Sequence, residues 1–187
     1  MDRIVLASNQ PHVIREFRQF IERRFPSFLF ATNEDLGTTE PPETGPSYAA
    51  MASDKAYPAA EFAHAYAVGV CEGLEVDCMD GGPGLESQSF GGAGASMNEK
   101  ARLIREAVAA VPEMARTARL RCTLILMPPP QDFADRDFQP AVFEATCEGL
   151  IPTYSPVEEN SGYDSLLWIP GKACRASRWA PGSRACA

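Results

Sequence analysis

The 187-residue sequence lacks the features that mark membrane and secreted proteins. No stretch approaches the roughly 20 apolar residues that a membrane-spanning helix requires. The N-terminus has no basic segment followed by an apolar run, as a secretory signal would, and Asp2 argues against an acid-poor organelle presequence. The six cysteines are scattered without a Cys-x-x-Cys pair. We therefore expect a cytoplasmic protein with reduced thiols.

Positive charge is also in short supply. The chain carries 17 Lys and Arg against 25 Asp and Glu, for a formal net charge of -8. Its sequence pI is near 4.8, so nucleic acid and anionic membranes would be repelled at long range. At 45% hydrophobic composition the chain can form a well-cored globular domain. We expect one domain over residues 1–187, with residues 170–187 as an atypical tail.

Three further motifs lack residues that their usual functions need. The glycine-rich run 91–94 has no Lys-Ser or Lys-Thr after it, so it is a flexible connection rather than a phosphate loop. The acidic residues within 132–137 lack the glycine and late glutamate of a calcium loop. His64 has no Asp or Ser at a partner spacing, so a surface or satisfied histidine is the better interpretation.

What the sequence does have is an alternation of apolar strand and helix patterns, which predicts the α/β class. Pro58 should bend or split the helix predicted over 48–66. Strands are predicted over 3–7, 28–31, 67–71, 74–78, 120–127, 142–149 and 166–170, and helices over 13–24, 48–66 and 98–111.

Short motifs along nearly the whole chain resemble those of the inosine/xanthosine triphosphate pyrophosphatase family. They occur in that family's order and with matching intervals. The matching segments are Ala7–His12 with Arg15–Phe17, Glu43–Gly45, Tyr48–Ala56, Val70–Asp77, Gly81–Ser87 and Ser161–Ser165.

This resemblance implies a two-lobed α/β fold with a long twisted mixed sheet, a cleft that holds the substrate, and a homodimer. The family hydrolyses deaminated purine nucleoside triphosphates to monophosphate and pyrophosphate. Such a reaction needs a divalent cation, cationic side chains for the phosphates and a carboxylate for the attacking water.

Several residues depart from the family's pattern at the positions that would bind metal. The glutamate and asparagine of the helix motif fall on Ala50 and Met51, and the paired aspartates fall on Val70 and Cys71. None of the four replacements offers the oxygen ligand that Mg²⁺ prefers. Cys71 has no neighbouring His or Lys to lower its pKa, which indicates a buried, inert thiol. We therefore predict no catalytic residue, no metal ligand and no cofactor.

The phosphate and base sites are eroded as well. The lysine of the first loop falls on His12 or, with another gap placement, on Val13, and the base-stacking phenylalanine falls on Ser161. The terminal Ser-His-Arg is recognisable at most as Ser177-Arg178. By resemblance, the remaining candidates for substrate binding are Ser8, Asn9, His12, Lys55, Tyr163, Asp164 and Arg178.

Three functions stay open at this point. The main prediction is a catalytically degenerate family member with a structural or binding role, as a homodimer or as a subunit of a larger assembly. An alternative is an active Mg²⁺-dependent pyrophosphatase with a relocated site. Glu72 is the nearest substitute carboxylate, although strand alternation would place it on the face of Val70, not of Cys71. The third function is a nucleotide sensor that binds without hydrolysis.

Overall fold

The computed structural model of the chain describes residues 3–130, 139–154, 156–157, 161–172 and 174–176. It divides into two compact units. The first comprises Met1–Cys71 and Cys122–Glu144, and the second comprises Glu72–Arg121 and Ala145–Ala187. The single domain expected over 1–187 stays a prediction. No helix in the described ranges is long and apolar enough to cross a membrane.

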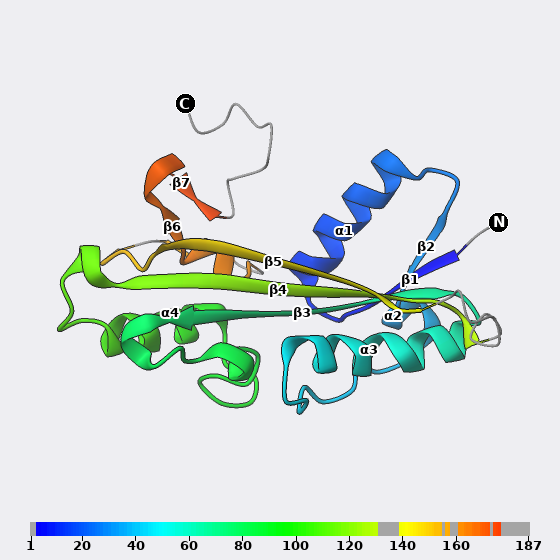
Figure 1. Cartoon of the computed structure of the whole chain (residues 1–187), viewed down its shortest axis with the longest axis horizontal. Helices are drawn as coiled ribbons and strands as arrows, with labels where there is room; N and C mark the ends of the chain where they lie inside the picture. Colours follow the sequence, from blue (N-terminus) through cyan, green and yellow to red (C-terminus); the bar gives the residue numbers. More distant parts are fainter. Residues whose placement is uncertain (1–2, 131–138, 155, 158–160, 173, 177–187) are drawn as a thin grey trace. The chain divides into compact units, whose positions relative to one another are not determined.

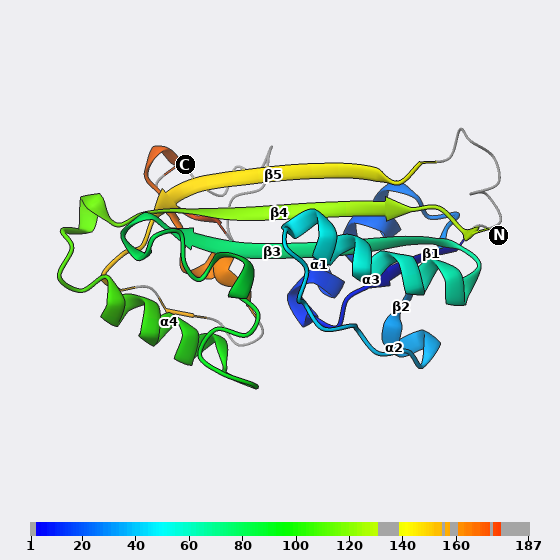
Figure 2. The same cartoon turned by 60° about the horizontal axis from the view of Figure 1, so that its bottom comes forward.

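The strands form a mixed sheet, as the sequence predicted. Across the described residues its order is β2-β1-β3-β4-β5-β6-β7. Strand β1 pairs in parallel with β2 and β3, whereas β6 pairs antiparallel with β5 and β7. Figure 2 shows the arrowheads of β3, β4 and β5 pointing in alternating directions. The strands are β1 Arg3–Ala7, β2 Leu29–Thr32, β3 Tyr66–Val76, β4 Thr117–Met127, β5 Ala141–Leu150, β6 Trp168–Ile169 and β7 Cys174–Arg175.

In the first unit, helices cover both faces of the parallel strands. Helix α1 (Pro11–Arg24) and helix α3 (Tyr48–Ala63) lie on opposite sides of β1 and β3 (Figure 1). The short helix α2 (Asn33–Leu36) starts with a reciprocal cap, in which Thr32 and Asp35 each bind the other's backbone N–H. Ser47 caps α3 by accepting from the Ala50 N–H. These caps fix where the helices begin.

Small residues let α3 pack directly onto β3. Ala52, Ala56 and Ala60 are buried on the helix, and Gly69 faces them from the strand. A Cβ at Gly69 would collide with the carbonyl oxygen of Ala52. The glycine is therefore required by close backbone approach, not by its conformational freedom.

The second unit has its own core around helix α4 (Met97–Ala107). Ile104 and Ala101 of this helix pack with Leu74 and Val76 of β3 and with Leu167. Short 3-10 turns connect its elements: η1 Asp77–Met79, η2 Gly84–Glu86, η3 Glu113–Ala115, η5 Tyr163–Ser165 and η6 Pro170–Lys172.

Several predicted elements differ from the structure; the helix expected over 98–111, for example, ends at Ala107. The two strands expected over 67–71 and 74–78 are one continuous strand, because Gly73 lacks only a side chain and keeps its backbone hydrogen-bonding groups. The helix expected over 48–66 ends at Ala63 with His64 in the left-handed region, at φ 47°, while Pro58 lies inside it. The strand expected over 166–170 is reduced to Trp168–Ile169.

Candidate functional site

The loop that follows β1 carries the first two predicted site residues. Ser8 is buried, and its Oγ accepts a hydrogen bond from the Gln10 N–H at 3.2 Å. The Asn9 N–H donates to Glu40 Oε2 at 2.8 Å. This loop lies at the carboxyl end of a parallel strand, where open α/β sheets place their ligands.

Lys55 of α3 is the most deeply buried cation of this region, with 1% of its side chain exposed. Its ammonium contacts Glu40 at 2.7 Å and also Glu43, and it donates to the carbonyl oxygen of Val70 at 3.0 Å. Burial by itself would lower the pKa of Lys55, but the two carboxylates outweigh burial and raise that pKa above its ordinary value. Lys55 is therefore charged throughout the physiological range.

Glu40 contacts both Asn9 and Lys55, and Glu43 contacts Lys55; neither glutamate was assigned a role from the sequence. Their side chains keep 15% and 11% of their surface exposed. We call Glu40, Glu43 and Lys55 the Glu-Lys-Glu cluster. Glu43 belongs to the Glu43–Gly45 motif, but nothing in the sequence pointed to Glu40, which approaches only through the fold of the 37–47 loop.

The Glu-Lys-Glu cluster fits a magnesium ion accompanied by a phosphate. Mg²⁺ is usually held by one or two carboxylates together with substrate phosphates and water, not by a full cage of protein ligands. No group of three or more His, Cys, Asp or Glu residues that would form such a cage occurs in the described part of the chain. Glu40 and Glu43 supply the two carboxylates, and Lys55 supplies a cation for phosphate.

At the positions where the family motif would carry Asn and the second Asp, the Cys71 thiol donates a weak hydrogen bond to the Met51 sulfur instead. Met51 Sδ and Cys71 Sγ lie 3.6 Å apart, and both residues are buried. Cys71 is thus the buried thiol that the sequence predicted. This contact offers no oxygen ligand to Mg²⁺.

Glu72 lies on the opposite face of β3 from Cys71, the position of the family's second aspartate. Strand β3 continues without interruption to Val76, so successive side chains alternate between its faces. Cys71 faces α3, where Met51 lies, and Glu72 therefore shares the other face with Val70. Glu72 could therefore stand in for the aspartate at Val70 but not for the one at Cys71, and the relocated site stays a prediction.

The remaining predicted residues are divided between the two units. His12 occupies the second position of α1 in the first unit and is half-buried. Tyr163 and Asp164 lie in η5 of the second unit. Ser177 and Arg178 lie outside the described residues.

Tyr163 has a structural environment in the second unit. It is 5% exposed, its hydroxyl donates to the Ser87 carbonyl at 2.8 Å, and burial raises its pKa. The ammonium of Lys100 donates to the same carbonyl at 3.1 Å and to that of Gln88 at 2.6 Å. Tyr163 and Lys100 thus hold the end of the 81–88 segment in place.

Asp77, which the family keeps, is also engaged structurally. It accepts from Thr117 Oγ1 at 2.5 Å and pairs with Arg119 at 2.7 Å. The hydrogen bond from Thr117 is the main cause of a lowered pKa at this carboxyl. Asp77 therefore joins β4 to the end of β3.

A sequence model of the Ham1 family matches residues 4–180. This chain belongs to the Ham1 family. A dITP/XTP pyrophosphatase of Vibrio parahaemolyticus is 31% identical over 184 residues, covering 98% of this chain and 88% of the relative. One from Methylococcus capsulatus is 31% identical over 179 residues, covering 96% and 86%.

Solved structures agree with this assignment. A HAM1 protein from Coxiella burnetii superposes with a TM-score of 0.78 at 25% identity, covering 97% of this chain and 88% of that protein. The Staphylococcus aureus Ham1 protein gives a TM-score of 0.75 at 23% identity, with 96% and 87% covered. The family resemblance and the α/β fold predicted from the sequence are confirmed.

Proposed function

We propose that this chain is an active nucleoside triphosphate pyrophosphatase that acts on deaminated purine nucleotides such as inosine triphosphate. The observation that supports this most is the Glu-Lys-Glu cluster beside the β1 loop. The names of its Ham1-family relatives give the substrate class. The predicted loss of catalysis rested on Ala50, Met51, Val70 and Cys71 and on the changed phosphate and base positions. The cluster supplies two carboxylates that had no role assigned from the sequence.

In this proposal the cluster exchanges partners when the nucleotide binds. Lys55 leaves its carboxylates and holds a phosphate oxygen, which keeps a buried ammonium paired with negative charge throughout. One glutamate of the cluster would hold Mg²⁺, which when bound would neutralise charge on the phosphate oxygens. The Asn9 N–H remains directed at this region as a further donor to the anion.

The reaction is hydrolysis of one anhydride bond. Water attacks the α-phosphorus, the bond between the α-phosphorus and the bridging oxygen breaks, and pyrophosphate leaves with the bonding electrons. The other glutamate of the cluster accepts the proton of the water. Most of the acceleration in such reactions comes from positioning and charge stabilisation, and we assign these roles to the two carboxylates and the lysine of the cluster.

A second candidate is nucleotide binding without hydrolysis. The contact between Met51 and Cys71 favours it, because this contact removes the oxygen donors that the family motif places there. In that case Lys55 would bind phosphate, but no carboxylate would be positioned for the water. The homodimer and the cytoplasmic location implied by the sequence stay predictions, and light scattering of the purified protein tests the former.

The test is pyrophosphate release from inosine triphosphate with and without Mg²⁺, with nucleotide binding measured in parallel by calorimetry. We expect release by the wild type that depends on Mg²⁺ and falls about 100-fold or more in Glu43→Gln. Glu99→Gln, a surface glutamate of α4, is the matched control and should leave the rate unchanged.

Each of the other possible results supports or contradicts a different functional hypothesis. Binding without release supports the second candidate. Neither binding nor release contradicts both. Release that survives Glu40→Gln and Glu43→Gln but is lost in Glu72→Gln would place the site at Glu72.

A further inference from the structure

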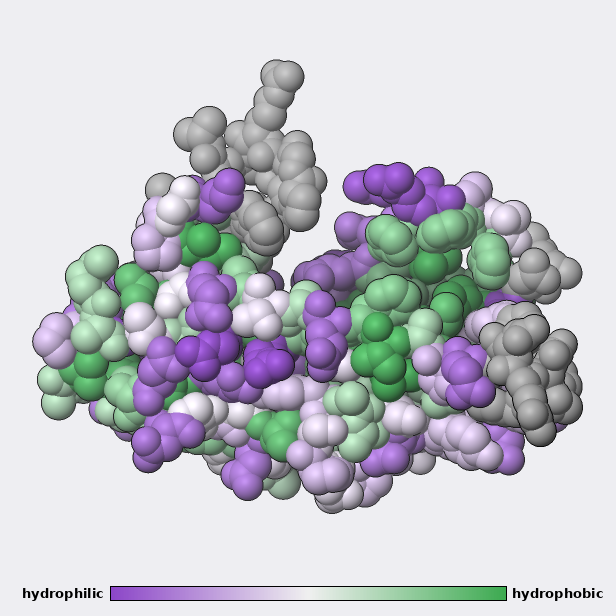
Figure 3. All heavy atoms as spheres, viewed as in Figure 1, coloured by the Kyte–Doolittle hydropathy of each residue, from purple (hydrophilic) through white to green (hydrophobic). Residues whose placement is uncertain are grey.

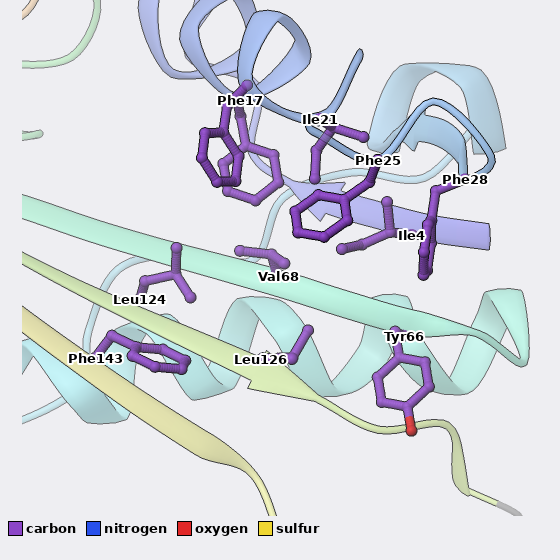
Figure 4. Close-up of a pocket in the computed structure, with 11 residues that line it drawn as sticks. Ile4, Phe17, Ile21, Phe25, Phe28, Tyr66, Val68, Leu124, Leu126 and Phe143 are labelled. Carbon is purple, nitrogen blue, oxygen red and sulfur yellow. The ribbon is translucent and has the colours of Figure 1, made fainter. Parts of the chain in front are cut away.

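An apolar cavity of about 700 Å³ lies within the first unit, between α1 and the strands β1, β3, β4 and β5. Figure 4 shows its side chains converging from the helix on one side and the strands on the other. They include Phe17 and Ile21 of α1, Val68 of β3, Leu124 and Leu126 of β4, and Phe143 of β5. This volume lies within the range of small-molecule sites, which are concave and mostly apolar.

The sequence builds this cavity by two periodicities. Phe17 and Ile21 are four residues apart and share one face of α1, whereas Leu124 and Leu126 are two apart and share one face of β4. Both faces are directed at the same space. One face of α1 and one face of β4 therefore supply the apolar lining together.

Large aromatic side chains remain exposed around the cavity. Phe20 is 52%, Phe25 46% and Phe143 57% exposed. In Figure 3, apolar residues gather on this part of the surface, next to the polar residues of α1. Contiguous apolar surface of this kind marks a binding site for an apolar group.

A second, more polar cavity adjoins the apolar one. A neighbouring cavity of about 420 Å³ shares Phe28 and Tyr66 with it and is also lined by Arg3 and His64. Arg3 is exposed, and its guanidinium suits a carboxylate. The apolar cavity and the cavity beside Arg3 thus meet at Phe28 and Tyr66.

We propose that the two adjoining cavities bind an anionic amphiphile, with an acyl chain in the apolar cavity and a carboxylate beside Arg3. The charge complementarity beside Arg3 is what selects this occupant. A helix of a partner protein, or a second copy of the chain, would need only a uniform apolar groove. The proposal does not depend on the pyrophosphatase site.

The experiment titrates the full chain with dodecanoate, below its micelle concentration, by isothermal calorimetry. We expect saturable binding of one equivalent. Phe143→Asp should weaken it at least about tenfold, since it places a charge against the chain. Phe20→Asp tests the same wall from α1, and because both side chains are exposed the fold should survive. Met114→Asp, at an exposed methionine of the second unit, is the control.

The head group is tested separately. Arg3→Glu should weaken dodecanoate binding several-fold and leave the binding of dodecan-1-ol unchanged, with Arg102→Glu as the control. Absence of saturable binding, or equal binding by Phe143→Asp, would overturn the proposal. So would a concentration-dependent dimer that Phe143→Asp abolishes, since it would assign this face to a second copy.

Discussion

Replacing Lys55 by methionine removes the cation from a buried triad and leaves both glutamates facing each other. Lys55 is 1% exposed, and the carboxylates are 15% and 11% exposed, so little water replaces the lost ammonium. Removing one partner of a buried ion pair costs about 3–5 kcal/mol. For a protein of this size, that cost corresponds to a fall in Tm of roughly 6–20 °C.

Thermal unfolding followed by circular dichroism measures this change. Lys172→Met removes an exposed lysine and should leave Tm within about 2 °C of the wild type, because surface substitutions have small effects. Adding Glu40→Gln and Glu43→Gln to Lys55→Met should restore much of the loss, because no buried charge then lacks a counter-charge. A Tm for Lys55→Met equal to that of Lys172→Met would refute the described electrostatics.

The same triad sets a dependence on alkaline pH. The pKa of Lys55 is raised by folding from its ordinary value of 10.5, so the folded state binds this proton more tightly. The resulting stability is fully present below pH 10.5 and is lost as the pH rises through the folded value. Lys55→Met should remove this contribution from the pH profile of Tm.

Further substitutions test packing in each unit. Gly69→Ala should destabilise by about 1–3 kcal/mol, because the new methyl group meets the Ala52 carbonyl, whereas Gly171→Ala enters open space and should be neutral in urea unfolding. Tyr163→Phe should cost only about 0.5–1 kcal/mol, because Lys100 still donates to the Ser87 carbonyl. Burial raises the pKa of Tyr163, so the stability contributed by its neutral hydroxyl is present below pH 10 and is lost as the pH rises through the folded pKa. If Tyr163→Phe shows the same loss of stability at alkaline pH, this assignment is wrong.

Local sequence patterns were sufficient for the regular elements that the core requires. The apolar run 3–7 and the helical spacing after it correspond to β1 and α1. Gly73 misled the prediction, because a glycine between apolar residues reads as a turn, whereas strand pairing on both sides keeps β3 continuous. Periodicity predicted the α/β class, whereas the family resemblance also predicted a mixed sheet.

The candidate site was only partly predictable. Lys55 and Asn9 were identified from motifs, and the exclusion of Met51 and Cys71 as oxygen ligands agrees with their buried contact. Glu40 was not identified, because its approach to Lys55 depends on how an irregular loop returns to α3, and no periodicity reports on that. Comparison with the family motifs thus identified the missing oxygen ligands at Met51 and Cys71, but it could not identify Glu40 in the 37–47 loop.

Pyrophosphate release from inosine triphosphate by the wild type and by Glu43→Gln tests the central claim most directly. If the Glu-Lys-Glu cluster serves hydrolysis, the wild type releases pyrophosphate only with Mg²⁺, and Glu43→Gln loses about 100-fold or more of that rate while remaining folded. No release by a folded wild-type protein, or an equal rate in Glu43→Gln, would contradict the account.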